Sequence, residues 1–365
     1  MSIQSTHRPG RPHPALSRRA LLAGTAAGAV GLSLAACGKG KKSGSQADSK
    51  TVTVVTHDSF HVSEDLQKAF TSETGYTLKI ATSGDAGALV NKLVLTKDAP
   101  LGDAVFGIDN TYATRALDQG VIDTSATVTL PKGAESYVVA DTPALAPIDV
   151  GDVCLNIDTG YFTGKGLTPP ATFEDLTKPE YKGLLVAINP TNSSPGMAWL
   201  LATIGHFGAG SFADYWKQLM ANGARIAEDW SAAYETDFSG SGKGTYPIVV
   251  SYASSPSFTV SDDGASSSTS ALLDTAFRQV EYAGVLKGAA NPEGGKAFVT
   301  WMLSKAVQED IPGQMYMYPV LPDAALPEAL TKFGPLSKSP VKVDPKEITT
   351  HREEWLNTWT EAVGK

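Results

Sequence analysis

Strand-type and helix-type hydrophobic patterns alternate along the chain from residue 51 onward. Residues 51–56 are a continuous β-branched run, which predicts a buried strand. Leu66, Ala69 and Phe70 then recur at helical spacing between a capping Ser63 and a terminating glycine. The same reasoning predicts strands over residues 51–56, 76–81, 103–108, 146–157, 184–188, 224–228, 247–251 and 279–287, and helices over residues 63–74, 86–95, 195–207, 213–222, 292–304 and 345–363. Such alternation is typical of a parallel α/β sheet.

The order of the predicted elements favours two α/β lobes, the second inserted into the first, over one large sheet. We assign residues 51–148 and 277–365 to the first lobe and residues 149–276 to the second. The roughly 310 residues that follow residue 50 are enough to build two cores.

Residues 1–36 have the pattern of an export signal. Arg18 and Arg19 precede an uncharged run, rich in Ala, Leu and Gly, that ends in Leu-Ala-Ala-Cys at Cys37. The run is too short for a permanent membrane span, and the arginine pair also resembles a twin-arginine signal. We expect Cys37 to carry a lipid and residues 37–50, which are polar and rich in Gly, Ser and Lys, to form a flexible tether. This predicts an exported protein anchored at the outer face of a bacterial cytoplasmic membrane.

Charge and cysteine content narrow the class of partner. Residues 1–36 contain four arginines and no acidic residue, so the rest of the chain carries a formal net charge of −12 rather than −8. An acidic surface argues against nucleic acid and mildly favours cationic ligands. With Cys37 lipidated, Cys154 has no partner for an internal disulfide.

Two Ser-Ser-Pro segments are candidates for a binding site. Ser193 and Ser194 precede a predicted helix, whose free N–H groups favour an anion such as phosphate, although a plain helix cap is the alternative. Ser254 and Ser255 follow a strand that ends at Tyr252. Ligands of α/β sheets collect at the carboxyl ends of strands, so this position favours a binding site, with a purely structural turn as the alternative.

Four more side chains have either a ligand-binding or a purely structural role. Trp230 follows a predicted strand. It either offers a stacking face to a flat or cationic ring of a ligand or packs in the core. Asp85 either caps the helix that follows it or offers its carboxylate to a ligand. His57 ends the first strand, and Tyr316 lies in an aromatic-rich segment.

Catalytic motifs are missing from the sequence. The Gly/Ser-rich segment at residues 240–245 lacks the spacing of a phosphate loop, and neither a nucleophile elbow nor a zinc-protease motif occurs. We therefore expect a protein that is not an enzyme and that uses neither a cofactor nor a metal.

Several blocks of the chain resemble, in order, the periplasmic thiamine-binding proteins of thiamine ABC importers. The blocks cover residues 53–60, 84–85 with 89–93, 107–110, 193–196, 230–234, 251–256 and 317–320. The resemblance extends from residue 51 to residue 363. It implies an α/β fold of the two-lobed periplasmic-binding-protein type (type II), in which two parallel-sheet, Rossmann-like lobes are joined by hinge strands around a ligand cleft.

The resemblance also implies a set of ligand-binding residues. Asp85 would face the cationic ligand, and the helix behind Ser193 and Ser194 would meet its hydroxyethyl end or phosphate. Trp230 and Tyr252 would contact the rings. The sequence departs from the family pattern at His57, Ala86 and Tyr316, where the family carries Tyr, Gly and Trp. The full implied set is His57, Asp85, Ala86, Ser193, Ser194, Trp230, Tyr252, Ser254, Ser255 and Tyr316.

The implied function is that of the extracytoplasmic receptor of an ABC importer, active as a monomer. Its ligand would be thiamine, with thiamine mono- and diphosphate as further candidates, and its protein partners would be the permease and ATPase of the importer. A ferric-ion or polyamine receptor of the same fold is the alternative.

Overall fold

The structure is a computed structural model that describes residues 50–140, 142–241 and 243–364. The expected export signal, the lipidation of Cys37 and the tether up to residue 49 lie outside these ranges. Within them, the helices are all too short or too polar to cross a bilayer.

The strands of the described residues join into one nine-stranded mixed sheet. Its order is β2-β1-β3-β8-β4-β7-β5-β6, with β9 paired to β4. The strands are β1 (Thr51–Thr56), β2 (Thr77–Thr82), β3 (Ala104–Asp109), β4 (Leu145–Asp158), β5 (Leu185–Ile188), β6 (Arg225–Ala227), β7 (Ile248–Tyr252), β8 (Thr269–Val285) and β9 (Tyr318–Pro319).

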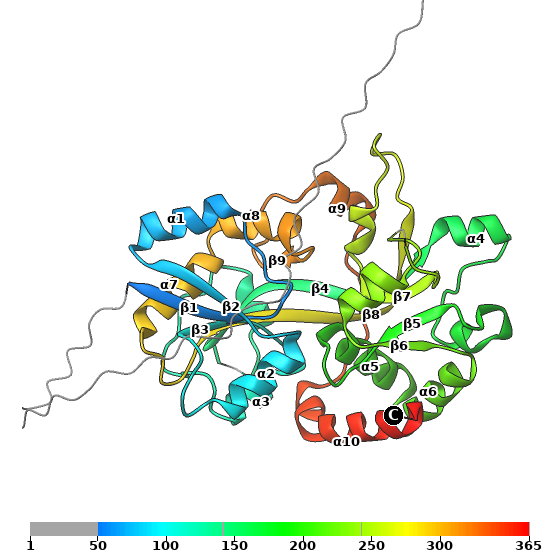
Figure 1. The fold of residues 1–365 in the computed structure, drawn as a ribbon, viewed down its shortest axis with the longest axis horizontal. Helices are drawn as coiled ribbons and strands as arrows, with labels where there is room; N and C mark the ends of the chain where they lie inside the picture. Colours follow the sequence, from blue (N-terminus) through cyan, green and yellow to red (C-terminus); the bar gives the residue numbers. More distant parts are fainter. Residues whose placement is uncertain (1–49, 141, 242, 365) are drawn as a thin grey trace, which may run out of the picture. The chain divides into compact units, whose positions relative to one another are not determined.

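The sheet is parallel at its two ends and antiparallel in its centre. β1 pairs in parallel with β2 and β3, and β5 pairs in parallel with β6 and β7. Between these sets, the long strands β4 and β8 run antiparallel to each other and to their outer neighbours. The predicted parallel pairing is thus correct for the two ends only. Because the long strands β4 and β8 lie between the two parallel ends and pair with both (Figure 1), the hydrogen-bonded ladder is continuous between the lobes.

Helices cover the faces of the sheet. They are α1 (Glu64–Thr74), α2 (Ala86–Leu95), α3 (Ala113–Asp118), α4 (Thr159–Lys165), α5 (Ser194–Phe207), α6 (Phe212–Ala221), α7 (Pro292–Met302), α8 (Lys305–Gln314), α9 (Glu328–Phe333) and α10 (Pro345–Val363). All six helices that the sequence predicts are present, within a few residues. α7 packs on β1, β3 and β8, and α5 packs on β7 and β8.

The last helix, α10, packs against α6 (Figure 1). Trp359 of α10 and Trp216 of α6 meet edge to face, with ring centroids 5.6 Å apart, and both are fully buried. The sequence-based boundaries put these helices in different lobes. The C-terminal helix therefore braces the segment that the sequence assigns to the inserted lobe, and the exact lobe boundaries stay a prediction.

Two polar side chains fix the starts of the helices that reach the candidate site. Asp85 caps α2, its side chain accepting a hydrogen bond from the backbone N–H of Ala86. Ser193 caps α5, its Oγ accepting from the N–H of Gly196, and Pro195 stands in the first turn. The cap of α5 is thus Ser193, one residue earlier than the cap position that the predicted helix over residues 195–207 implies.

Candidate ligand-binding site

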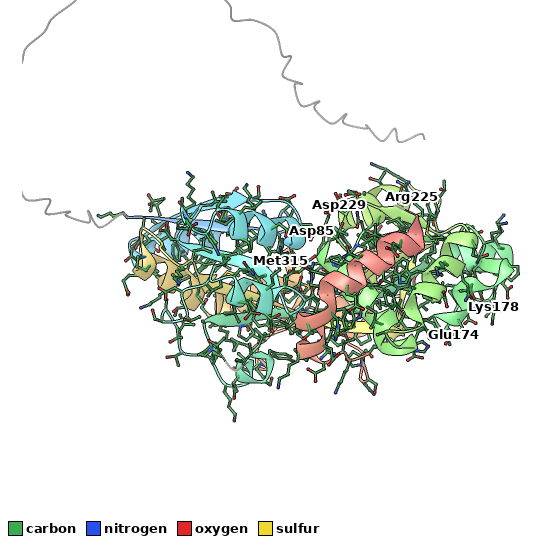
Figure 2. The ribbon with its side chains drawn as sticks, turned by 90° about the horizontal axis from the view of Figure 1, so that it is seen from below. Asp85, Glu174, Lys178, Arg225, Asp229 and Met315 are labelled. Carbon is green, nitrogen blue, oxygen red and sulfur yellow. The ribbon has the colours of Figure 1, made fainter. Side chains whose placement is uncertain are left out.

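Two adjoining cavities lie between the two parallel ends of the sheet. The first, of about 280 Å³, is lined by Trp230, Tyr252 and Tyr316, and we call it the aromatic compartment. The second, of about 400 Å³, is lined by Asp58, Asp85, Glu228 and Asp229, and we call it the acidic compartment. The two share the lining residues His57, Asp58, Ser59, Asp85, Trp230 and Ser231, so they form one cleft. Figure 2 shows Asp85, Asp229 and Met315 gathered at this cleft, away from Glu174 and Lys178.

The structure brings together most, but not all, of the residues that the sequence singled out. Those that line the cleft are His57, Asp85, Ser194, Trp230, Tyr252 and Tyr316. Ala86, Ser193 and Ser254 are buried and are not among its lining residues. Ser255 lines a third, neighbouring cavity of about 290 Å³.

The start of α5 is already bonded to the protein's own carboxylates. Asp85 Oδ1 accepts hydrogen bonds from the backbone N–H of Ala86, at 2.6 Å, and from that of Ser194, at 3.3 Å. The carboxylate of Asp109 accepts a hydrogen bond from the Ser194 hydroxyl. The expectation that this helix start is free to meet a phosphate is therefore wrong for this conformation. The backbone N–H of Ser194 is bonded to Asp85, its hydroxyl to Asp109, and the N–H of Gly196 to Ser193 Oγ.

Trp230 is held in place by a hydroxyl relay. Its Nε1 donates to Ser251 Oγ at 2.9 Å, and Ser251 Oγ lies 2.9 Å from Ser255 Oγ. One face of the indole stacks on Tyr234, with ring centroids 5.0 Å apart and planes within 10°. Ser255 therefore acts on the site through the orientation of Trp230, a role that its position in the sequence did not reveal.

A second aromatic pair closes the neighbouring side of the cleft. The rings of Phe258 and Tyr316, from segments far apart in the chain, lie 3.6 Å apart between centroids. Both are exposed, at 40% and 37% of their surface, although they are large and apolar. Tyr316 also has a backbone φ of 64°, a left-handed conformation that is costly for a bulky residue and that concentrates at functional sites. Sequence reasoning missed Phe258, which the Ser-Ser-Pro segment could have drawn attention to.

Carboxylates dominate the charge of the cleft. The acids that line its two compartments are Asp58, Asp85, Glu228, Asp229, Glu235 and Glu281, and no lysine or arginine is among the described lining residues. Burial raises the pKa of Asp85, while hydrogen bonds from Ser193, Ala86 and Ser194 act in the opposite direction. Such a lining favours a cationic ligand.

Glu281, on β8, is the acid that sequence reasoning overlooked. It is 6% exposed, and its Oε1 lies 3.3 Å from His57 Nε2. Burial alone would lower the pKa of His57, but the charges of Glu281, Asp85 and Asp58 raise it overall. The signal for Glu281 was present in the sequence as a single charged residue within the otherwise apolar run of residues 280–286.

The described residues contain no group of three or more His, Cys, Asp or Glu side chains placed to hold a metal ion. Tyr252, which lines the cleft, donates its hydroxyl to Gln279 at 3.3 Å. Burial raises the pKa of Tyr252 well above its ordinary value, with the charge of Glu281 acting in the same direction.

Comparison with known proteins places this architecture in a family. The periplasmic thiamine-binding protein of Salmonella typhimurium is 26% identical over 326 residues, which cover 86% of this chain and 94% of that protein. A solved periplasmic thiamin-binding protein superposes with a TM-score of 0.75 at 25% identity, covering 86% and 96% of the two chains. The iron-bound protein HitA from Pseudomonas aeruginosa shares the fold, with a TM-score of 0.68 at 20% identity and coverage of 86% and 99%. The family model for bacterial extracellular solute-binding proteins matches residues 103–334, so this chain belongs to that family.

Proposed function

We propose that this solute-binding protein captures thiamine for an ABC importer. Thiamine joins a permanently charged thiazolium ring to a flat aminopyrimidine, so its receptor needs a countercharge and an aromatic face close together. The observation that carries the proposal is that Trp230 and the carboxylates of Asp85 and Glu281 line one compartment of about 280 Å³.

The charge of the compartment suits the thiazolium ring. Asp85, at the start of α2, and Glu281, on the central strand β8, supply negative charge to the same compartment, and an aromatic face adds a cation–π attraction of about 1–2 kcal/mol. Two relatives named as thiamine-binding proteins support the same ligand, since the matches cover 94% and 96% of their own length.

Unphosphorylated thiamine is the form that we propose as the main ligand. Phosphate groups would bring negative charge next to Asp58, Glu228 and Asp229. The N–H of Ser194, at the start of α5, is already bonded to Asp85 and so does not offer a phosphate a free donor. Thiamine monophosphate and diphosphate are therefore weaker candidates.

Iron is the alternative ligand that the fold itself raises, since HitA shares the fold. Tight ferric binding calls for anionic oxygen ligands, and tyrosinate is costly at Tyr252, because burial raises its pKa well above the ordinary value. Ala253 follows Tyr252, so no second tyrosine adjoins it. A polyamine also suits the acidic lining, but it would make less use of the ring of Trp230.

As a receptor, the protein would work without a cofactor and as a monomer. The importer's permease and ATPase are its proposed partners, and the expected lipid on Cys37 would hold it at the membrane next to them. Closure of the two lobes over the ligand would present the docking surface to the permease.

A thermal-unfolding panel tests the proposal. The ligands are thiamine, its mono- and diphosphate, Fe³⁺ and spermidine, each added to the purified protein. A ligand at a hundredfold excess over its Kd stabilises the folded state by about 2.7 kcal/mol, so thiamine should raise the Tm clearly and the diphosphate less. No shift with thiamine, together with a shift from Fe³⁺ or spermidine, would overturn the assignment.

A further inference from the structure

Two acidic side chains face each other on the strands that cross between the lobes. Asp149 of β4 and Glu281 of β8 are direct register partners in the antiparallel ladder. Asp149 is fully buried and Glu281 is 6% exposed. Two carboxylates at paired positions of neighbouring strands, both withdrawn from water, cannot both be ionised without a large electrostatic cost.

The two acids differ in what stabilises their charge. Glu281 has His57 Nε2 at 3.3 Å and lines the aromatic compartment. Neither carboxyl oxygen of Asp149 has a hydrogen-bond partner within the described part of the chain. Burial, and then the negative charge of Glu281, raise the pKa of Asp149 well above its ordinary value. Because two buried carboxylates at paired positions are costly to charge together, the pair favours one proton, and Asp149, whose oxygens have no donor to stabilise a charge, is the member that holds it.

The cluster of His57, Asp149 and Glu281 stands among further titratable groups. Those that act on its members come from four segments of the chain and are Asp58, Asp85, Asp109 and Tyr252. All four are acids or tyrosine, so His57 is the sole basic group among these four residues and the three members of the cluster. His57 and the proton on Asp149 thus offset the negative charge of the cleft before a ligand binds.

We propose that the cluster of His57, Asp149 and Glu281 releases a proton when the cleft takes up a cation. The inference rests on the proposed function, since it takes thiamine as the cation. A positive ligand beside Glu281 repels the charged imidazole of His57 and stabilises an ionised Asp149, and both effects favour loss of a proton. The proton leaves an N–H of His57 or the O–H of Asp149 for the solvent, while the ligand's bonds are unchanged. The ligand's charge replaces that of the proton.

Proton release links affinity to pH. If about one proton leaves for each ligand bound, binding tightens about tenfold for each unit by which the pH rises through the titration of the cluster. The neutral aminopyrimidine alcohol, which lacks the thiazolium ring, brings no charge and should release no proton.

Calorimetry of the whole protein with thiamine tests the inference. Titrations at one pH between about 6 and 8, in buffers of different ionisation enthalpy, give the number of protons released, and a pH series gives the slope of Kd. The variants are Asp149→Asn and His57→Gln, with Asp274→Asn as control, because Asp274 is an exposed acid on the same strand as Glu281.

We expect the wild-type protein and Asp274→Asn to release about one proton for each thiamine bound. Asp149→Asn or His57→Gln should release clearly less, with a flatter dependence of Kd on pH. Thiamine binding with the same heat in every buffer would overturn the inference and leave the proposed function intact. A proton release that neither Asp149→Asn nor His57→Gln reduces would also overturn the inference. If Asp149→Asn does not fold, the wild-type buffer series and His57→Gln still decide. Absence of thiamine binding in every buffer would overturn the proposed function itself.

Discussion

Asp85 Oδ1 accepts a hydrogen bond from the backbone N–H of Ser194, at 3.3 Å, and thereby joins the start of α2 to the start of α5. α2 packs on β1 and β3, whereas α5 packs on β8 and β7, so the bond joins elements on different parts of the sheet at the cleft that Asp85 and Ser194 both line. The same carboxylate caps α2 and lines both compartments. One side chain thus combines a structural cap, a contact between the lobes and a negative charge that faces the ligand site.

The charge of Asp85 can be separated from its role as a cap. Asp85→Asn keeps an oxygen that can accept from Ala86 and Ser194 but removes the negative charge. We expect thiamine affinity to fall about tenfold or more, while the free energy of unfolding changes by less than about 1 kcal/mol. Calorimetry and thermal unfolding measure the two effects.

Asp344→Asn is the matched control for this change. Asp344 caps α10 through the backbone N–H of Lys346, is exposed and lies away from the cleft. The Asp344→Asn variant should bind thiamine with unchanged affinity. An equal loss of affinity in both variants would show that the effect of Asp85→Asn comes from helix capping rather than from charge.

Gly87 allows the close approach of α2 to the segment before α5. A Cβ atom at this position would lie 2.6 Å from the hydroxyl of Tyr112 and 2.8 Å from the backbone oxygen of Asn192. We expect Gly87→Ala to push the two segments apart, to weaken thiamine binding and to lower the free energy of unfolding by about 1–3 kcal/mol.

Gly164, on α4, has open space around its Cα and serves as the control. Gly164→Ala should leave binding unchanged and stabilise the protein by up to about 1 kcal/mol. Chemical denaturation and calorimetry of both variants check the pair. Unchanged binding in Gly87→Ala would mean that this approach of the segments is not needed for ligand capture.

Asp109 makes stability depend on pH. Burial raises the pKa of this carboxyl to about 6, against the opposing hydrogen bonds from Ser194 and Thr111. Because the folded protein holds the proton more tightly than the unfolded chain, the contribution of Asp109 is fully present below the unfolded pKa of 3.8. It is lost as the pH rises through about 6.

The variant Asp109→Asn, which does not ionise, should lack this loss. Between about pH 4 and pH 7 the stability of the wild-type protein should therefore fall relative to the variant, by an amount on the order of 3 kcal/mol. Denaturation curves of both proteins across this range measure the difference. A difference that stays constant with pH would contradict the raised pKa.

The local elements of the fold were largely predictable from the sequence, whereas their central connection was not. β1 and α10 match their predicted bounds, because a β-branched run and a helix between a capping residue and glycine carry strong local signals. β8 was predicted from residue 279, but it begins at Thr269. Its first half lies partly exposed beside the end of β4, so it lacks a continuous apolar run. The antiparallel centre of the sheet follows from this long-range pairing.

In the candidate site too, single residues could be predicted from the local sequence, whereas contacts between distant segments could not. Trp230 and Asp85 could be recognised by residue type and position. The pairing of Glu281 with His57, and with Asp149, depends on segments more than a hundred residues apart in the chain. Ser193 and Ser255 were expected as contacts of the ligand, but a cap and a hydroxyl relay to Trp230 account for their hydrogen bonds. Short motifs cannot distinguish a group that touches a ligand from one that orients its neighbour.

Calorimetric titration of the wild-type protein, Trp230→Phe and Trp230→Ala with thiamine tests the central claim most directly. Trp230 stacks on Tyr234 and lines both compartments of the cleft. Thiamine should bind the wild-type protein at one site. Trp230→Ala should weaken binding about tenfold or more, and Trp230→Phe, which keeps an aromatic face, should weaken it less. Absence of thiamine binding to the wild-type protein, or an affinity unchanged in Trp230→Ala, would contradict the account.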